Sequence, residues 1–206
     1  MSFDHWWVGL LIDERDYERF SRDFAAAADK AVLSPESRQA IEDWRQCPSG
    51  YEQEATMHGE AADRAHRFIW AFNLPGFDQL AEQFLTLGGK FAEFPMAERC
   101  FRIAMAARHT PLSIVWHALG YERAGLLPGQ MGNMLLHPRD IESALKTTSI
   151  AYAGLSSQDL LDAAARYCGW YVSDDTLQEV ISFLPDGLGL AKERGQGFLA
   201  LARPQI

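Results

Sequence analysis

Cysteine is scarce in this chain of 206 residues, where only Cys47, Cys100 and Cys168 occur. The three lie far apart, are odd in number and form no C-x-x-C pair, which argues against a disulfide framework and against a thiolate zinc site. Cys100 and Cys168 fall on apolar faces of predicted helices, where free cysteine usually serves as a small buried residue. We therefore expect reduced thiols in a cytoplasmic protein.

Basic residues are also in the minority, with 19 Lys and Arg against 28 Asp and Glu and a formal net charge of −9. A chain with this charge repels phosphate backbones and anionic lipid surfaces, so we predict neither a nucleic acid nor a membrane as its partner. A basic protein would be attracted instead and would associate faster. Residues 1–68 hold fourteen acids and eight bases, whereas residues 69–206 hold fourteen acids and eleven bases. The first third therefore carries most of the excess.

Long apolar runs are missing as well. The run HWWVGLLI at 5–12 is too short to span a bilayer, and no other run approaches eighteen residues. Asp4 and His5 stand where a signal peptide needs basic residues. Because 48% of the residues are apolar, the chain can still bury a sizeable core. The length fits a single globular α-rich domain over residues 1–206.

No assembled catalytic motif is present. The sequence has no G-x-S-x-G, no P-loop, no H-E-x-x-H and no G-x-G-x-x-G that follows a predicted strand. His117 follows Trp116 on a short apolar helix, where a lone histidine is usually a hydrogen-bonded core residue. We predict neither a bound metal nor a cofactor.

Apolar periodicity predicts a mainly α fold, a compact domain of about nine helices with a small sheet. Ser34-Pro35 and Thr110-Pro111 are typical starts, with a capping side chain followed by proline at the first helical position. The predicted helices cover residues 14–30, 35–46, 60–72, 78–87, 95–108, 112–119, 139–153, 157–171 and 175–184, and a short tenth helix runs to Arg194 after a break at Pro185 and Gly187.

Two apolar segments at opposite ends of the chain, 5–12 and 197–202, predict strands. A lone strand would leave its backbone groups unpaired, so we predict that these two pair with each other as a small sheet.

An acidic connector follows the second predicted helix, and core packing does not obviously explain it. It belongs to the stretch WRQCPSGYEQEATMHGEAAD at 44–63, which has aromatic residues beside clustered carboxylates. The predicted interaction residues are Asp43, Trp44, Tyr51, Glu52, Glu54, Glu60 and Asp63. Carboxylates beside aromatic residues favour the binding of a basic protein, so we predict a protein-binding module. A concrete version is a bacterial immunity or antitoxin protein whose carboxylates imitate phosphates in the active site of a basic toxin.

The alternative is a hydrolase-like enzyme on a helical scaffold. Its site would consist of His58, Glu60, Asp63 and His66, the densest cluster of possible metal ligands, or of the glycine-rich loop 120–133. Asp63 and His66 are three residues apart and can share a helix face. The bland interpretation of the cluster is an exposed helix start, where acids favour the positive end of the helix dipole.

Tryptophan is the last informative residue type, with six copies. Trp70, Trp116 and Trp170 fall at helical core spacing and are predicted to be packing residues. Trp6 and Trp7 point to opposite faces of the first strand, so one of them is expected to be exposed if only one face of the sheet is covered. An exposed tryptophan there could support self-association.

Overall fold

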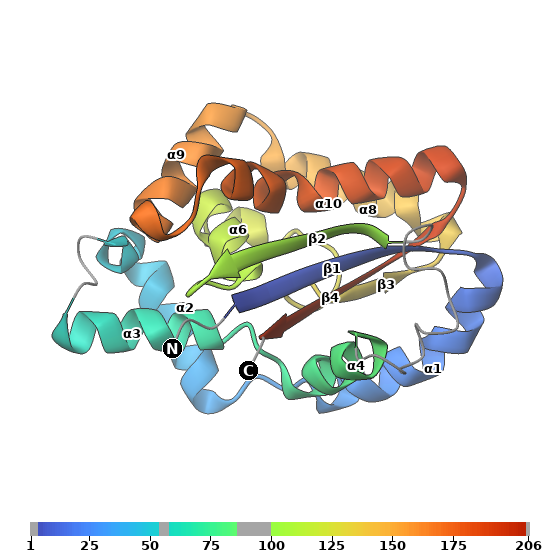
Figure 1. Cartoon of the computed structure of the whole chain (residues 1–206), viewed down its shortest axis with the longest axis horizontal. Helices are drawn as coiled ribbons and strands as arrows, with labels where there is room; N and C mark the ends of the chain where they lie inside the picture. Colours follow the sequence, from blue (N-terminus) through green and yellow to red (C-terminus); the bar gives the residue numbers. More distant parts are fainter. Residues whose placement is uncertain (1–3, 54–57, 86–99, 205–206) are drawn as a thin grey trace.

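The computed structural model describes residues 4–53, 58–85 and 100–204, and within them the fold is mainly α with one small antiparallel sheet (Figure 1). The strands are β1 (Asp4–Ile12), β2 (Cys100–Ala107), β3 (Met134–Leu136) and β4 (Gly197–Pro204), in the order β2-β1-β4-β3. The predicted pairing of the two terminal strands is confirmed. β1 and β4 run antiparallel as neighbours, with Leu10 opposite Leu199.

Nine α-helices lie in the described ranges. They are α1 (Glu14–Lys30), α2 (Pro35–Gln46), α3 (Gly59–Trp70), α4 (Pro75–Leu85), α6 (Pro111–Leu119), α7 (Tyr121–Ala124), α8 (Ile141–Tyr152), α9 (Ser157–Cys168) and α10 (Asp174–Arg194), with short 3₁₀ turns η1 (Pro48–Tyr51), η4 (Pro138–Asp140) and η5 (Gly169–Tyr171). None of the helices described is both long and apolar enough to cross a membrane.

Helices cover both faces of the sheet, which explains why its central strands are apolar at nearly every position. In β1, Trp7 and Leu11 join the larger core, which α6, α8, α9 and α10 cover, whereas Val8 and Leu10 join a second core under α1 and α4 (Figure 1). Neither strand tryptophan is therefore a free surface anchor. Trp7 is fully buried and donates from Nε1 to the Gly132 carbonyl, and Trp6 is half-buried against the second core.

The helix predicted over 95–108 is wrong for its described part, because residues 100–107 form strand β2 beside β1. Residues 95–99 lie outside the described ranges. The segment CFRIAMAA is apolar at most positions, so the spacing of its apolar residues is compatible with a helix and with a strand. Pairing with β1 decides the outcome, and the buried Ala104 and Ala106 lie on one face of the strand.

The predicted break at Pro185 is also wrong, since α10 continues through it to Arg194. Proline has no backbone N–H, so the carbonyl four residues earlier, that of Ile181, loses its helical donor. The Tyr152 hydroxyl of α8 donates to that carbonyl at 3.0 Å. A tertiary hydrogen bond therefore compensates for the one that proline removes.

Candidate functional site

The two aromatic residues of the predicted interaction site are core residues. Trp44 is 0% exposed and stacks on Phe68, with 4.7 Å between ring centroids, and Tyr51 is 3% exposed beside the same ring. Trp44 stands on α2 and Tyr51 on the 3₁₀ turn η1, and both side chains join the core that includes residues of α3 and α6. The prediction that they present surface anchors is wrong, because their rings have no surface to offer.

The predicted carboxylates fall into two groups. Asp43 and Glu52 are half-buried and engaged: Gln39 Nε2 donates to Asp43 at 2.7 Å, and Arg166 Nε lies 3.4 Å from Glu52. Glu60 and Asp63 are exposed on α3, without an ion pair inside the described part of the chain. Glu54 lies outside the described residues.

Two contacts tie the end of the acidic connector to the last turn of α9 and to the turn η5 that follows it. Besides the Glu52–Arg166 pair, the backbone N–H of Trp170 donates to Gln53 Oε1 at 3.2 Å. Gly169 makes this approach possible, because a Cβ at that position would lie 1.0 Å from Gln53 Oε1. Its φ of +59° also falls in the region that side chains disfavour. Segments more than a hundred residues apart thus form one surface.

Trp170 is the most exposed large apolar residue of this surface, so the prediction that it is a packing residue is wrong. Its side chain is 77% exposed, more than Val32, Leu126 or Ile150, the other large apolar residues exposed in the described ranges. The ring centroids of Trp170 and Tyr171 are 4.0 Å apart. The Arg108 guanidinium lies over the Tyr171 ring, 4.0 Å from its centroid. We call the group Trp170, Tyr171, Arg108, Gln53 and Glu52 the Trp170 surface.

Arg108, Tyr171 and Trp170 contact one another in sequence, so Trp170 is supported from one side only. Arg108 adopts a φ of +64°, a left-handed conformation that costs a non-glycine residue about 1–2 kcal/mol. Its contact with Tyr171 is a cation–π interaction, and the Tyr171 ring in turn supports Trp170. Tryptophan has only two side-chain torsions, so it offers a large contact area at a low cost in conformational entropy on binding.

Exposed carboxylates lie at the same end of the molecule. The start of α10 carries Asp174 and Asp175 a few residues after Trp170, and the start of α3 carries Glu60 (Figure 1). None of these has an ion pair among the residues the structure describes. They also stabilise the helix N-termini on which they stand.

The four residues of the alternative enzyme site do not converge. His58 and Glu60 are exposed at the start of α3, and His66 Nε2 accepts a hydrogen bond from Trp70 Nε1 at 2.6 Å. Across residues 4–53, 58–85 and 100–204, no three His, Cys, Asp or Glu side chains lie close enough to hold a metal ion. The geometry therefore gives this cluster no assembled site.

A buried aromatic cluster lies beneath α2. Trp44 Nε1 donates to His117 Nδ1 at 3.1 Å, and the imidazole stacks on Tyr167 with centroids 4.5 Å apart and an interplanar angle of 11°. Burial, aided by the charge of Arg166 and by His109, lowers the pKa of His117 to about 4. A neutral imidazole that accepts at Nδ1 carries its proton on Nε2. His117 is thus a structural residue, as its sequence context predicts.

The thiol of Cys168, next to Tyr167, is also inert. It is fully buried, and burial raises the pKa of this thiol far above its ordinary value, so it stays protonated. Cys47 is exposed and unpaired with another cysteine, and the Cys100 side chain lies outside the described part.

We expect His117 to make the fold acid-sensitive. Its pKa is about 4 in the folded chain and about 6.5 when unfolded, so between these values only the unfolded chain binds the proton. The stabilisation is complete above pH 6.5 and decreases as the pH falls to 4, by about 3 kcal/mol in all. Urea unfolding of wild type and His117→Gln at pH 7 and pH 4 measures this, because glutamine can still accept from Trp44 but does not titrate. Equal pH dependence in the two proteins would contradict the assignment.

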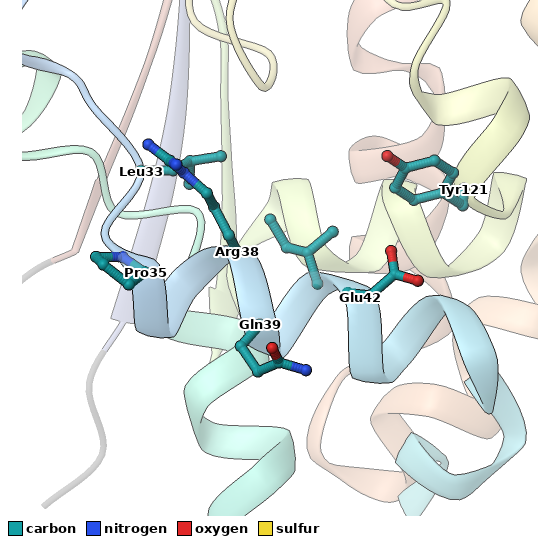
Figure 2. A pocket seen from close by; sticks show the side chains of 7 residues that line it. Leu33, Pro35, Arg38, Gln39, Glu42 and Tyr121 are labelled. Atoms are coloured by element: carbon teal, nitrogen blue, oxygen red, sulfur yellow. The ribbon is translucent and has the colours of Figure 1, made fainter.

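The loop predicted at 120–133 contains the short helix α7 and contributes to an open pocket of about 530 Å³ against α2 (Figure 2). Leu33, Pro35 and Ile41 provide apolar lining, and Tyr121 closes the opposite side. Arg45 fixes that side: its guanidinium lies 4.7 Å from the Tyr121 centroid and reaches Glu42 and Glu122 at 3.4 and 3.5 Å.

None of the protein-family models, curated proteins or solved structures compared with this chain matches it.

Proposed function

We propose that this chain is an acidic, cytoplasmic protein-binding module that holds a basic partner at the Trp170 surface. The observation that carries the proposal is the 77% exposure of Trp170, whose ring contacts Tyr171, which in turn contacts Arg108. Tryptophan is the residue most enriched among binding hot spots, and a soluble chain gains nothing in stability from exposing it. Glu52 and Gln53 bring the acidic connector to its edge.

The charge of the chain supports a basic partner. The formal net charge is −9, and Glu60, Asp63, Asp174 and Asp175 are exposed at this end without an ion pair among the described residues. Such carboxylates steer a cationic surface toward the aromatic contact and accelerate encounter. In the specific form of the proposal, the chain is a bacterial immunity or antitoxin protein that covers the basic active site of a toxin.

Removing two of these charges tests the electrostatic part. We expect Glu60→Gln with Asp63→Asn to slow association with the captured partner about three- to tenfold at low salt and to weaken its salt dependence. Surface plasmon resonance at several salt concentrations measures both. The matched control is Glu18→Gln with Asp29→Asn on α1, which changes the net charge equally at exposed positions elsewhere. Equal slowing by both variants would show that only net charge matters.

A further inference from the structure

We propose that the pocket between α8, α9 and α10 binds a small primary amine with an apolar body, whose ammonium group pairs with the Asp186 carboxylate. The pocket has a volume of about 360 Å³, which lies within the range of small-molecule sites. It contains none of the residues of the Trp170 surface, so this site is independent of the protein-binding proposal.

One face of each of three helices contributes to the pocket. The helices α8 and α9 pack beside α10 on the same side of the sheet (Figure 1). On α10, Ser182 and Asp186 are four residues apart and share a face, and on α8, Leu145 and Tyr152 stand two helical turns apart on one face. Near its start, α9 adds Leu160. Regular helices, rather than loops, therefore form the walls of this site.

The inner part of the pocket is apolar. Leu160 and Ile181 line the pocket and are buried, and Leu145 and Pro185 line it and are half-buried. An aromatic ring or a short alkyl chain that enters between these side chains leaves water, which favours binding by about 25 cal/mol for each Å² of apolar surface buried. The lining thus selects a ligand with an apolar body.

The polar residues at the mouth select the head group of the ligand. Ser149, Ser157 and Gln178 are exposed lining residues with neutral side chains that can donate or accept hydrogen bonds. Among the described residues that line the pocket, Asp186 alone carries a charge. A carboxylate at the edge of an apolar pocket favours a cation and disfavours a second anion, so an ammonium group fits this position and a carboxylate or phosphate does not.

The charge of Asp186 also acts inside the pocket. Burial, and in addition the negative charge of Asp186, raise the pKa of the Tyr152 hydroxyl, which donates to the Ile181 carbonyl at 3.0 Å between α8 and α10. The carboxylate therefore lies near a hydroxyl that belongs to the wall of the pocket. An ionised carboxylate has about four acceptor positions, so contacts within the protein leave positions for an ammonium N–H. Such a charge-assisted hydrogen bond is about twice as strong as one between neutral groups.

Isothermal titration of the full chain with 2-phenylethylamine at pH 7 tests the proposal. We expect a Kd below about 1 mM. Two analogues should bind at least about tenfold more weakly: 2-phenylethanol, in which a neutral hydroxyl replaces the ammonium, and 3-phenylpropanoate, which carries a negative charge instead. Because this comparison uses the wild-type chain, it does not depend on how any variant folds.

Asp186→Asn should weaken the binding of 2-phenylethylamine by at least about tenfold and leave that of 2-phenylethanol within about twofold. The matched control is Asp162→Asn, which removes the same charge from an exposed position on α9 that does not line the pocket, and which should leave amine binding within about twofold of wild type. Both positions are exposed, so the melting temperatures of the two variants should stay close to that of wild type.

Four results would overturn the proposal. They are no binding of the amine up to about 10 mM, equal affinity for the amine and the alcohol, wild-type affinity of Asp186→Asn for the amine, and an equal loss in Asp162→Asn, which would mean that only net charge attracts the amine. None of them bears on partner binding at the Trp170 surface.

Discussion

Replacing Trp44 by alanine is expected to lower the free energy of unfolding by about 3–5 kcal/mol. The side chain is fully buried, stacks on Phe68 and donates to His117, so its removal leaves a large cavity and an imidazole nitrogen without its donor. Typical domains are stable by about 5–15 kcal/mol, so this loss is a large fraction of the total. Urea unfolding at pH 7 measures it.

Trp170→Ala is the matched control for that experiment. It removes the same side chain from a position that is 77% exposed, and its stability should change by less than about 0.5 kcal/mol. A Trp44→Ala protein as stable as Trp170→Ala would mean that Trp44 is a surface residue, and the packing described under α2 would be wrong.

Trp170→Ala should in turn reduce affinity for the partner by about thirtyfold or more, equivalent to about 2 kcal/mol at a hot spot. The physical reason is that an exposed indole beside the Tyr171 ring gains a large contact area on binding and has only two side-chain torsions to fix. The partner is first recovered by affinity capture from an extract of the source organism, and the affinities are then measured by isothermal titration.

Ile150→Ala provides the control for apolar surface as such. Ile150 is 53% exposed on α8, and its truncation should leave the affinity within about twofold of wild type. If Trp170→Ala binds as tightly as Ile150→Ala, the contact surface lies elsewhere on the molecule.

The sequence predicted the helix starts correctly, because hydrogen bonds between neighbouring residues determine them. Ser34 and Thr110 cap α2 and α6 with proline at the first helical position, as their dipeptides predict, and Ser156 caps α9 in a capping box. The terminal strands were predictable because each needs a partner and the other is the nearest match in length and apolarity.

Features decided by tertiary contacts were not predictable in the same way. CFRIAMAA fits two periods, and only the presence of β1 beside it selects the strand. Pro185 is tolerated inside α10 because Tyr152 reaches the Ile181 carbonyl, a contact between residues 29 apart.

At the candidate site, too, tertiary contacts determine which aromatic residues are buried. The sequence named Trp44 and Tyr51 as interaction residues and Trp170 as a packing residue, whereas the structure buries the first two and exposes the third. Trp44 stands at core spacing on α2, and its neighbours on α3 and α6 bury it, whereas Trp170 follows the last residue of α9 at a turn. Gly169, directly before Trp170, ends α9 with a positive φ. A glycine at this position was the sequence feature that indicated that Trp170 lies beyond the helix and not on its buried face.

Hydrogen–deuterium exchange of the protein, alone and saturated with the captured partner, tests most directly whether recognition occurs at the Trp170 surface. We expect partner-dependent protection of amides in residues 48–53 and 166–175, the two segments that Gln53 and Glu52 join. Protection confined to α1 and α4 on the opposite face of the sheet, with unchanged exchange around Trp170, would contradict the proposed binding surface.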